Sequence, residues 1–245
     1  MRIKKLIFNK KSGILSGKRI MVVCASADSV GANCLNRKGM VINMKNYRIY
    51  LIRHGITQGN LDGKYIGLTD LPLCEEGEGA IASLKALDVY PNVQKVYSSP
   101  LKRCLQTADI IYPEKLLKRI DNISECDFGD FEGKTQAELQ ENEDYLEWIK
   151  GGYEACPPGG ESFGHFTIRC LDGLEEIFKD MMANEIGSAA VITHSGVIMN
   201  LLAGYGLPKM RPIDFACNQG EGFEIQLSTF LWQHGPVFEI VGKLF

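Results

Sequence analysis

Short apolar runs alternate with segments of helical periodicity, and this alternation restricts the possible folds more than any other feature of the chain. The runs cover residues 48–52, 93–97 and 189–193. Their length and their Val, Ile and Tyr content predict buried strands. Before the last run, apolar residues recur at helical spacing over residues 163–181. The pattern predicts an α/β fold, a three-layer α/β/α sandwich with a mostly parallel sheet covered on both faces.

Local signals predict further helices. Residues 77–87 have a helical pattern, and Ser98-Ser99-Pro100 is typical of a helix start, with serine as N-cap and proline at the first helical position. Thr135 and Glu138 form a capping-box pattern for a helix running to about residue 150. The helix within 163–181 is expected to turn these residues toward the core: Phe163, Phe166, Cys170, Leu171, Leu174, Ile177, Phe178 and Met181.

The last two apolar segments, residues 223–231 and 237–241, are expected to form a hairpin at the edge of the sheet. With 245 residues, of which 45% are hydrophobic, the chain can bury the core of one such domain. No apolar run reaches the roughly 18 to 20 residues that a membrane-spanning helix needs. The eight cysteines form no C-x-x-C pair and have no metal-ligand spacing with histidine. We therefore expect a soluble cytoplasmic protein with reduced thiols and no metal.

Charge is distributed unevenly along the chain. Residues 1–43 contain nine Lys and Arg residues and one acidic residue, Asp28, a net charge of +8, whereas the remainder has a net charge of −11. The acidic body argues against a nucleic-acid substrate. Any phosphate site must therefore be built from locally concentrated positive charge.

Residues 1–43 have no sustained helical or strand period, and we interpret them as a flexible basic extension or as translated upstream sequence, with Met44 as a possible start. Two alternatives remain for this segment. It is long enough for a nucleic-acid-binding or membrane-binding tail. Its apolar stretch at residues 20–25 resembles a signal peptide, although six residues fall short of the usual apolar core of about 7 to 15.

Unusual polar residues follow each of the three predicted parallel strands. Arg53 and His54 come after the first strand, Arg103 lies in the first turn of the helix after the second, and His194 follows the third. In open α/β sheets, ligands bind outside the carboxyl ends of the strands. The sequence therefore predicts that these four residues meet at one edge of the sheet.

This combination of residues suits phosphoryl transfer. Arginine holds two phosphate oxygens with its planar fork, and helix N-termini add oriented N–H groups. A neutral imidazole can form a labile covalent intermediate, and Arg53 would favour the neutral ring of His54. A carboxylic acid with a raised pKa is expected nearby to protonate the leaving group. Each residue alone also has a purely structural interpretation, which we prefer for His165 and His234.

Residues 51–60, Leu-Ile-Arg-His-Gly-Ile-Thr-Gln-Gly-Asn, resemble the L-x-R-H-G-x-T-x-x-N signature of the histidine phosphatase superfamily, also called the phosphoglycerate mutase-like family. In the next matching block, at residues 65–77, Cys74 replaces the usual threonine. The resemblance covers about residues 47–205 and implies a histidine phosphatase domain over residues 44–245. Further blocks resemble the family in the same order, at residues 65–77, 98–108, 125–133, 158–162 and 191–196.

The resemblance implies a role for each matched residue. His54 would be phosphorylated, and Glu125 would be general acid and then general base for water. Glu161 would be structural or close to the substrate. No metal or organic cofactor is implied. The residues implied to hold the phosphoryl group are Arg53, Asn60, Arg103 and His194.

The implied function is hydrolysis of a small phosphomonoester through a phosphohistidine. Alternatives are phosphoglycerate mutase-type transfer and a non-catalytic phospholigand-binding module. Glu125 and His194 are only 69 positions apart, a spacing similar to the short phosphatase branch rather than to the mutases. The short form resembles α-ribazole phosphatases, but sugar-phosphate and phosphoserine phosphatases are similar at this level. Residues 134–160, with Tyr145, Trp148 and Tyr153, and residues 217–223 are the expected specificity elements; the sequence leaves the oligomeric state open.

Overall fold

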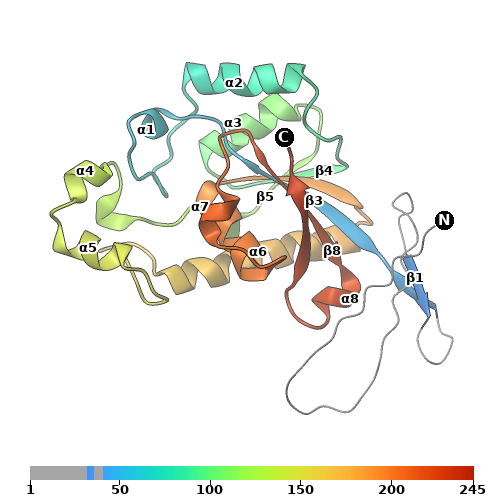
Figure 1. Ribbon diagram of the computed structural model, residues 1–245. Coiled ribbons are helices and arrows are strands. Elements are labelled where there is room, and N and C mark those ends of the chain that lie inside the picture. The colour runs from blue at the N-terminus through green and yellow to red at the C-terminus, as the bar shows by residue number, and fades with distance from the viewer. Residues whose placement is uncertain (1–31, 36–40) are drawn as a thin grey trace, which may run out of the picture.

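The computed structural model describes residues 32–35 and 41–245, and within them a seven-stranded sheet forms the middle layer (Figure 1). The strand order is β5–β4–β6–β3–β8–β9–β7. Strands β3, β4, β5 and β6 run parallel to one another, and β8 is antiparallel to both of its neighbours. The strands are β3 (Asn46–Arg53), β4 (Lys95–Ser98), β5 (Leu117–Arg119), β6 (Ser188–Thr193), β7 (Gly206–Leu207), β8 (Gly222–Ser228) and β9 (Phe238–Lys243).

Helices cover both faces of the sheet, which confirms the predicted three-layer, mostly parallel α/β fold (Figure 1). The longer helices are α2 (Glu75–Ala86), α3 (Lys102–Ile111), α6 (Phe163–Ala183) and α7 (Ser195–Tyr205). The shorter ones are α1 (Gln58–Leu61), α4 (Gln136–Leu139), α5 (Glu143–Ile149) and α8 (Thr229–Trp232). No helix in residues 32–35 and 41–245 combines the length and the apolar character that crossing a membrane requires.

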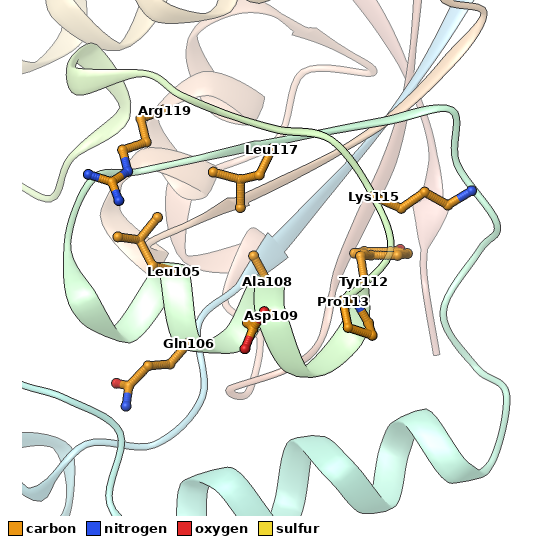
Figure 2. Close-up of a pocket in the computed structure, with 9 residues that line it drawn as sticks. All are labelled: Leu105, Gln106, Ala108, Asp109, Tyr112, Pro113, Lys115, Leu117 and Arg119. Carbon is orange, nitrogen blue, oxygen red and sulfur yellow. The ribbon is translucent and has the colours of Figure 1, made fainter.

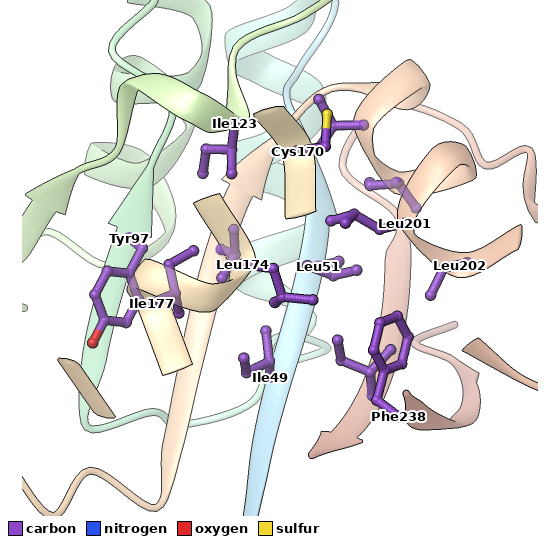
Figure 3. Packing of buried hydrophobic residues seen from close by; sticks show 14 of the residues in the cluster. Ile49, Leu51, Tyr97, Ile123, Cys170, Leu174, Ile177, Leu201, Leu202 and Phe238 are labelled. Atoms are coloured by element: carbon purple, nitrogen blue, oxygen red, sulfur yellow. The ribbon is translucent and has the colours of Figure 1, made fainter. Parts of the chain in front are cut away.

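Alternation along β3 divides the interior into two cores. Ile49 and Leu51 point toward α6 and α7, whereas Tyr50 and Ile52 point toward α2 and α3. Successive side chains of a strand face opposite sides, so a run that is apolar throughout serves both faces. Figure 3 shows the first core, in which Leu174 and Ile177 of α6 pack on the sheet. The apolar run ends at Ile52, so the next two residues, Arg53 and His54, lie at the rim of both cores.

Several predicted helix boundaries are wrong, for identifiable reasons. Helix α3 begins after Leu101, two residues later than predicted. The Ser99 hydroxyl is hydrogen-bonded to His194 and so does not cap the helix. Asp70 caps it instead, by accepting from the Lys102 N–H at 2.7 Å. The predicted helix from Thr135 has its capping box but stops at Leu139. A second N-cap, Asn142, then starts α5.

The hairpin of β8 and β9 is present, but it does not form the edge of the sheet. Strand β8 lies between β3 and β9, and the short strand β7, which was not predicted, pairs outside β9. The predicted strand over residues 223–231 ends at Ser228, where α8 begins. Strand β5 was also not predicted. Strands β1 (Ala32–Leu35) and β2 (Val41–Met44) pair with each other in a segment where no regular element was predicted; the remaining residues of 1–43 lie outside the described ranges.

Phe163 was predicted to face the core but is 47% exposed, because it is the first residue of α6, where the helix has not yet reached the sheet. Phe178 of the same helix is fully buried. We expect Phe178→Ala to lower the free energy of unfolding by about 3–5 kcal/mol, through lost apolar burial and a residual cavity. Phe163→Ala should change it by less than about 1 kcal/mol. Urea denaturation of both variants measures the difference, and equal effects would contradict this assignment of the core.

Candidate active site

The register of the parallel strands brings the predicted site residues to one edge of the sheet. Arg53 at the end of β3 pairs with Thr193 at the end of β6, and Ser98 at the end of β4 pairs with Ile192. The chain continues this pairing beyond the strands, since the His54 N–H donates to the Thr193 carbonyl at 2.9 Å. The segments that follow β3, β4 and β6 therefore leave the sheet side by side, as the sequence predicted.

His54 is a buried, neutral imidazole, and one of its two ring nitrogens is hydrogen-bonded to the backbone. Its side chain is 5% exposed, and Nδ1 lies 2.7 Å from the Gly55 carbonyl oxygen. A carbonyl can only accept, so Nδ1 carries the proton and Nε2 keeps its lone pair. Burial, and then the positive charge of Arg103, lower the pKa of His54 to about 3. At neutral pH the ring is therefore unprotonated at Nε2, as a nucleophilic imidazole must be.

The segment after His54 is tied to α3. The Gly55 N–H donates to the Thr107 hydroxyl at 2.9 Å, and this hydroxyl donates to the Arg103 carbonyl at 2.6 Å. A side chain at position 55 would crowd Ile81 of α2. These contacts fix the position of the His54 backbone relative to that of Arg103.

His194 lies against His54. The two ring centroids are 5.1 Å apart, with the planes at 63°. His194 is fully buried, and its Nε2 is 2.8 Å from the Ser99 hydroxyl oxygen. Burial holds the pKa of His194 well below its usual value, and the neighbouring His54 adds to the effect. Both rings are therefore neutral hydrogen-bonding groups in the same buried volume.

Arg53 and Arg103 bring positive charge to this volume without a carboxylate partner at salt-bridge distance in the described part of the chain. Backbone carbonyls hold the terminal nitrogens: Cys217 for Arg53 at 2.7 Å, and Gly67 and Thr69 for Arg103 at 2.7 and 2.9 Å. The Nε–H of each arginine is buried and has no hydrogen-bond partner among the described residues. A buried donor without an acceptor costs about 1–3 kcal/mol. Two such donors on charged groups indicate a site for an anion.

Glu125 is a buried carboxyl group held by backbone N–H groups. It is 8% exposed, and it accepts from the Cys126 N–H at 3.0 Å and from the Gly196 N–H, in the first turn of α7, at 3.1 Å. Burial raises the pKa of Glu125, while these hydrogen bonds and the charges of Arg103 and Arg53 partly oppose the shift. A carboxyl group with a raised pKa can carry a proton near neutral pH and release it to a developing negative charge. The structure thus brings together Arg53, His54, Arg103, Glu125 and His194, here called the candidate cluster.

Two other predicted residues have different surroundings. The Asn60 carboxamide oxygen accepts from the N–H and the hydroxyl of Thr57, both at 3.1 Å, and so caps α1. No hydrogen bond in residues 41–245 joins the Asn60 side chain to the candidate cluster, and its phosphate contact stays a prediction. Glu161 pairs with Arg169 and accepts from the Asp127 N–H at 3.1 Å, which is the structural one of its two predicted roles.

Sequence reasoning missed residues that support the candidate cluster. Arg169 donates to the carbonyls of Ser124 and Glu125 at 2.9 and 3.2 Å and so fixes the backbone on both sides of the Glu125 Cα. Glycine at position 196 leaves room for Glu125, because a Cβ there would displace the Glu125 carboxylate from its present position. Glycine in the first turn of a helix that starts at a candidate histidine was the available signal for Gly196. No local signal marks Arg169, because the two carbonyls that it holds lie 45 and 44 residues before it in the chain.

The two expected specificity segments are partly explained by packing. The Cys217 carbonyl that begins one of them holds Arg53. In the other, Tyr145 and Trp148 pack with Tyr65 and Phe128 in an aromatic group, where the Tyr65 and Tyr145 hydroxyls are 2.8 Å apart. Tyr153 is 57% exposed. Phe128 lies against Gly67, whose carbonyl accepts from Arg103, so this aromatic group borders the candidate cluster.

A separate hollow lies along α3 and β5 and contains no member of the candidate cluster (Figure 2). Its lining residues are Leu105, Gln106, Ala108, Asp109, Tyr112, Pro113, Lys115, Leu117 and Arg119. Among the residues that the structure describes, no three His, Cys, Asp or Glu side chains are placed to share a metal ion.

Comparison with known proteins gives consistent matches. The family model for the histidine phosphatase superfamily (branch 1) matches residues 49–227. The adenosylcobalamin/alpha-ribazole phosphatase of Escherichia coli (strain K12) is 30% identical over 178 residues, covering 71% of this chain and 86% of the relative. A 2,3-bisphosphoglycerate-dependent phosphoglycerate mutase of Rhizobium etli is also 30% identical, with coverage of 64% and 78%. The crystal structure of the alpha-ribazole phosphatase from Shigella flexneri has a TM-score of 0.62 and 29% identity, covering 73% of this chain and 89% of that one.

The neutral state of His54 is testable by NMR. Its imidazole should stay unprotonated as the pH falls from about 8 to 5, because its pKa in the folded protein is about 3 whereas the unfolded value is near 6.5. A titration midpoint near 6.5 for the His54 ring would contradict the geometry described above.

The same shift has a consequence for stability. Below pH 6.5 the unfolded chain takes up a proton on His54 that the folded protein does not, so the free energy of unfolding should fall with pH, by up to about 1.4 kcal/mol per pH unit from this ring. Above pH 6.5 the ring contributes no pH dependence. His54→Gln should remove this contribution between about pH 6.5 and 3, as measured by urea denaturation. Identical pH dependences for the variant and the parent protein would show that the ring protonates normally.

Proposed function

The chain belongs to branch 1 of the histidine phosphatase superfamily, and we propose that it hydrolyses a small phosphomonoester in two steps through a phosphohistidine at His54. The observation that carries the proposal is the pair of buried, unpartnered Nε–H groups of Arg53 and Arg103 beside a neutral imidazole. Charge on a transferring phosphoryl group spreads over its oxygens, and catalysis consists mainly of holding and stabilising that charge.

In the first step, Nε2 of His54 attacks phosphorus. The new N–P bond forms as the P–O bond to the alcohol breaks, and the leaving oxygen takes the proton from the Glu125 carboxyl group. Arg53 and Arg103 donate to the phosphoryl oxygens through their free Nε–H groups. His194, whose ring lies beside that of His54, donates to a phosphoryl oxygen from the ring nitrogen that is not bonded to Ser99.

In the second step, water attacks the phosphohistidine. Glu125, now a carboxylate, takes a proton from the water as its oxygen bonds to phosphorus. The N–P bond breaks, and inorganic phosphate leaves His54 neutral, with Nε2 free again. One carboxyl group thus acts as acid and then as base, which requires a pKa near the working pH, and burial shifts the pKa of Glu125 in that direction.

For the substrate we propose α-ribazole phosphate as the first candidate. Supporting this choice are the short connection between Glu125 and His194 and the relatives named as alpha-ribazole phosphatases. The aromatic group around Tyr65 and Trp148 offers flat apolar surfaces suited to a ring system. We place the reaction in the cytoplasm because the six cysteine side chains that the structure describes are free thiols.

A panel of phosphomonoesters tests the substrate. Phosphate release from α-ribazole phosphate should exceed release from phosphoserine and 3-phosphoglycerate by at least about tenfold in kcat/KM. A preference for phosphoserine would overturn the assignment but leave the chemistry intact. Conversion of 3-phosphoglycerate to 2-phosphoglycerate, without phosphate release, would replace hydrolysis by mutase activity.

Replacing Glu125 separates the two steps. With p-nitrophenyl phosphate, whose leaving group needs no proton, Glu125→Gln should still phosphorylate His54 but should hydrolyse the phosphohistidine about 10²–10⁴-fold more slowly. Rapid mixing should therefore show a burst of about one p-nitrophenolate per active site before slow turnover.

The double variant Glu125→Gln, His54→Asn is the matched control and should show no burst. A burst that persists without His54 would move the nucleophile to another residue. A Glu125→Gln enzyme with normal turnover would remove Glu125 from the second step.

A further inference from the structure

Arg103 is held in place by a segment that has little packing of its own. Gly67 is buried, but Leu68 and Thr69 are exposed, so burial holds little of the segment whose carbonyls accept from Arg103 beyond Gly67 itself. The far end of the segment is attached to α3, since Asp70 accepts from the Lys102 N–H at 2.7 Å. The Thr69 carbonyl also accepts from the Leu71 N–H at 3.0 Å, so the carbonyl whose orientation needs a further cause is that of Gly67.

Glu132 supplies that cause by accepting from two N–H groups of the same short segment. One carboxylate oxygen accepts from the Leu68 N–H at 2.7 Å, and the other accepts from the Thr69 N–H at 2.8 Å and from the Thr69 hydroxyl. The peptide group that joins Gly67 to Leu68 thus donates its N–H to Glu132 and offers its carbonyl to Arg103. We propose that Glu132 is a positioning residue for Arg103 that acts through this backbone.

The arrangement has an electrostatic advantage. Linked hydrogen bonds polarise one another, so a carboxylate on the N–H side makes the carbonyl on the other side a better acceptor for a guanidinium. Arg103, which is 1% exposed, is then oriented by negative charge that does not touch it. A carboxylate in direct contact would compete with a phosphoryl group for the same donors, whereas Glu132 leaves the Arg103 Nε–H free.

The close approach between this segment, Glu132 and the Cys126 carbonyl depends on glycine at position 67. A Cβ at position 67 would collide with the Cys126 carbonyl, and it would lie 2.6 Å from a Glu132 carboxylate oxygen. Cys126 directly follows Glu125, so the segment held by Glu132 also packs against the backbone next to the proton donor. The proposal rests on the proposed function to the extent that Arg103 binds the phosphoryl group.

Glu132→Gln tests the proposal with the shape of the side chain preserved. Its amide replaces one acceptor by a donor that faces the N–H groups of residues 68 and 69. We expect kcat/KM for p-nitrophenyl phosphate to fall, and the Kd for inorganic phosphate to rise, by about ten- to a hundredfold. Thermal unfolding confirms that the variant is folded.

Glu138→Gln is the matched control, because Glu138 also accepts from a backbone N–H and a threonine hydroxyl, at 2.7 and 2.8 Å, but only to cap α4. This variant should keep phosphate binding and turnover within about twofold of the parent protein. Equal effects of Glu132→Gln and Glu138→Gln would overturn the proposal.

A double-mutant cycle distinguishes positioning of Arg103 from general support. Lysine at position 103 cannot donate to the two carbonyls with a planar fork, so Glu132→Gln should have less than about a twofold further effect in the Arg103→Lys background. An undiminished effect there would show that Glu132 acts independently of Arg103.

The readouts also separate this inference from the proposed function. A parent protein that hydrolyses no phosphomonoester overturns the proposed function, and the Kd for phosphate still tests Glu132. An active parent protein whose turnover and phosphate binding are unchanged by Glu132→Gln overturns this inference alone.

Discussion

The parallel pairing of β6 with both β3 and β4 is the constraint on which the site depends. These three strands end in register, and the residues that follow β3 and β4, His54 and Ser99, donate their backbone N–H groups to the carbonyls of the last two residues of β6, directly before His194. Both faces of the strands are sealed by apolar cores. The rigidity of the sheet is therefore transmitted directly to the imidazoles, without an intervening flexible loop.

Burying two arginines and two histidines together would normally be costly, and the structure limits that cost through the backbone. Carbonyls rather than carboxylates accept from Arg53 and Arg103, and both imidazoles are neutral because burial and nearby positive charge disfavour the imidazolium form. Glu125, the one carboxyl group of the candidate cluster, is stabilised by backbone N–H groups. The site thus keeps an excess of positive charge for a phosphoryl group to neutralise.

Much of this arrangement could be predicted from the sequence, because strand ends and strand order determine which residues meet. The apolar runs located β3, β4 and β6, and the polar residues after them located the cluster. What escaped prediction depends on contacts between distant segments. Ser99 was expected to cap a helix, but His194 engages its hydroxyl and Asp70 caps the helix instead. Arg169 and Glu132 act on backbone that lies far from them in sequence, and no spacing rule reveals such partners.

The central claim is that His54 itself carries the phosphoryl group between the two steps. It is tested most directly by quenching the enzyme in alkali during turnover and locating the added phosphoryl group by tandem mass spectrometry. The account predicts one phosphoryl group on the peptide containing His54, stable in alkali and lost in mild acid. Phosphoryl transfer to another side chain, or steady hydrolysis with no labelled histidine at any time point, would contradict it.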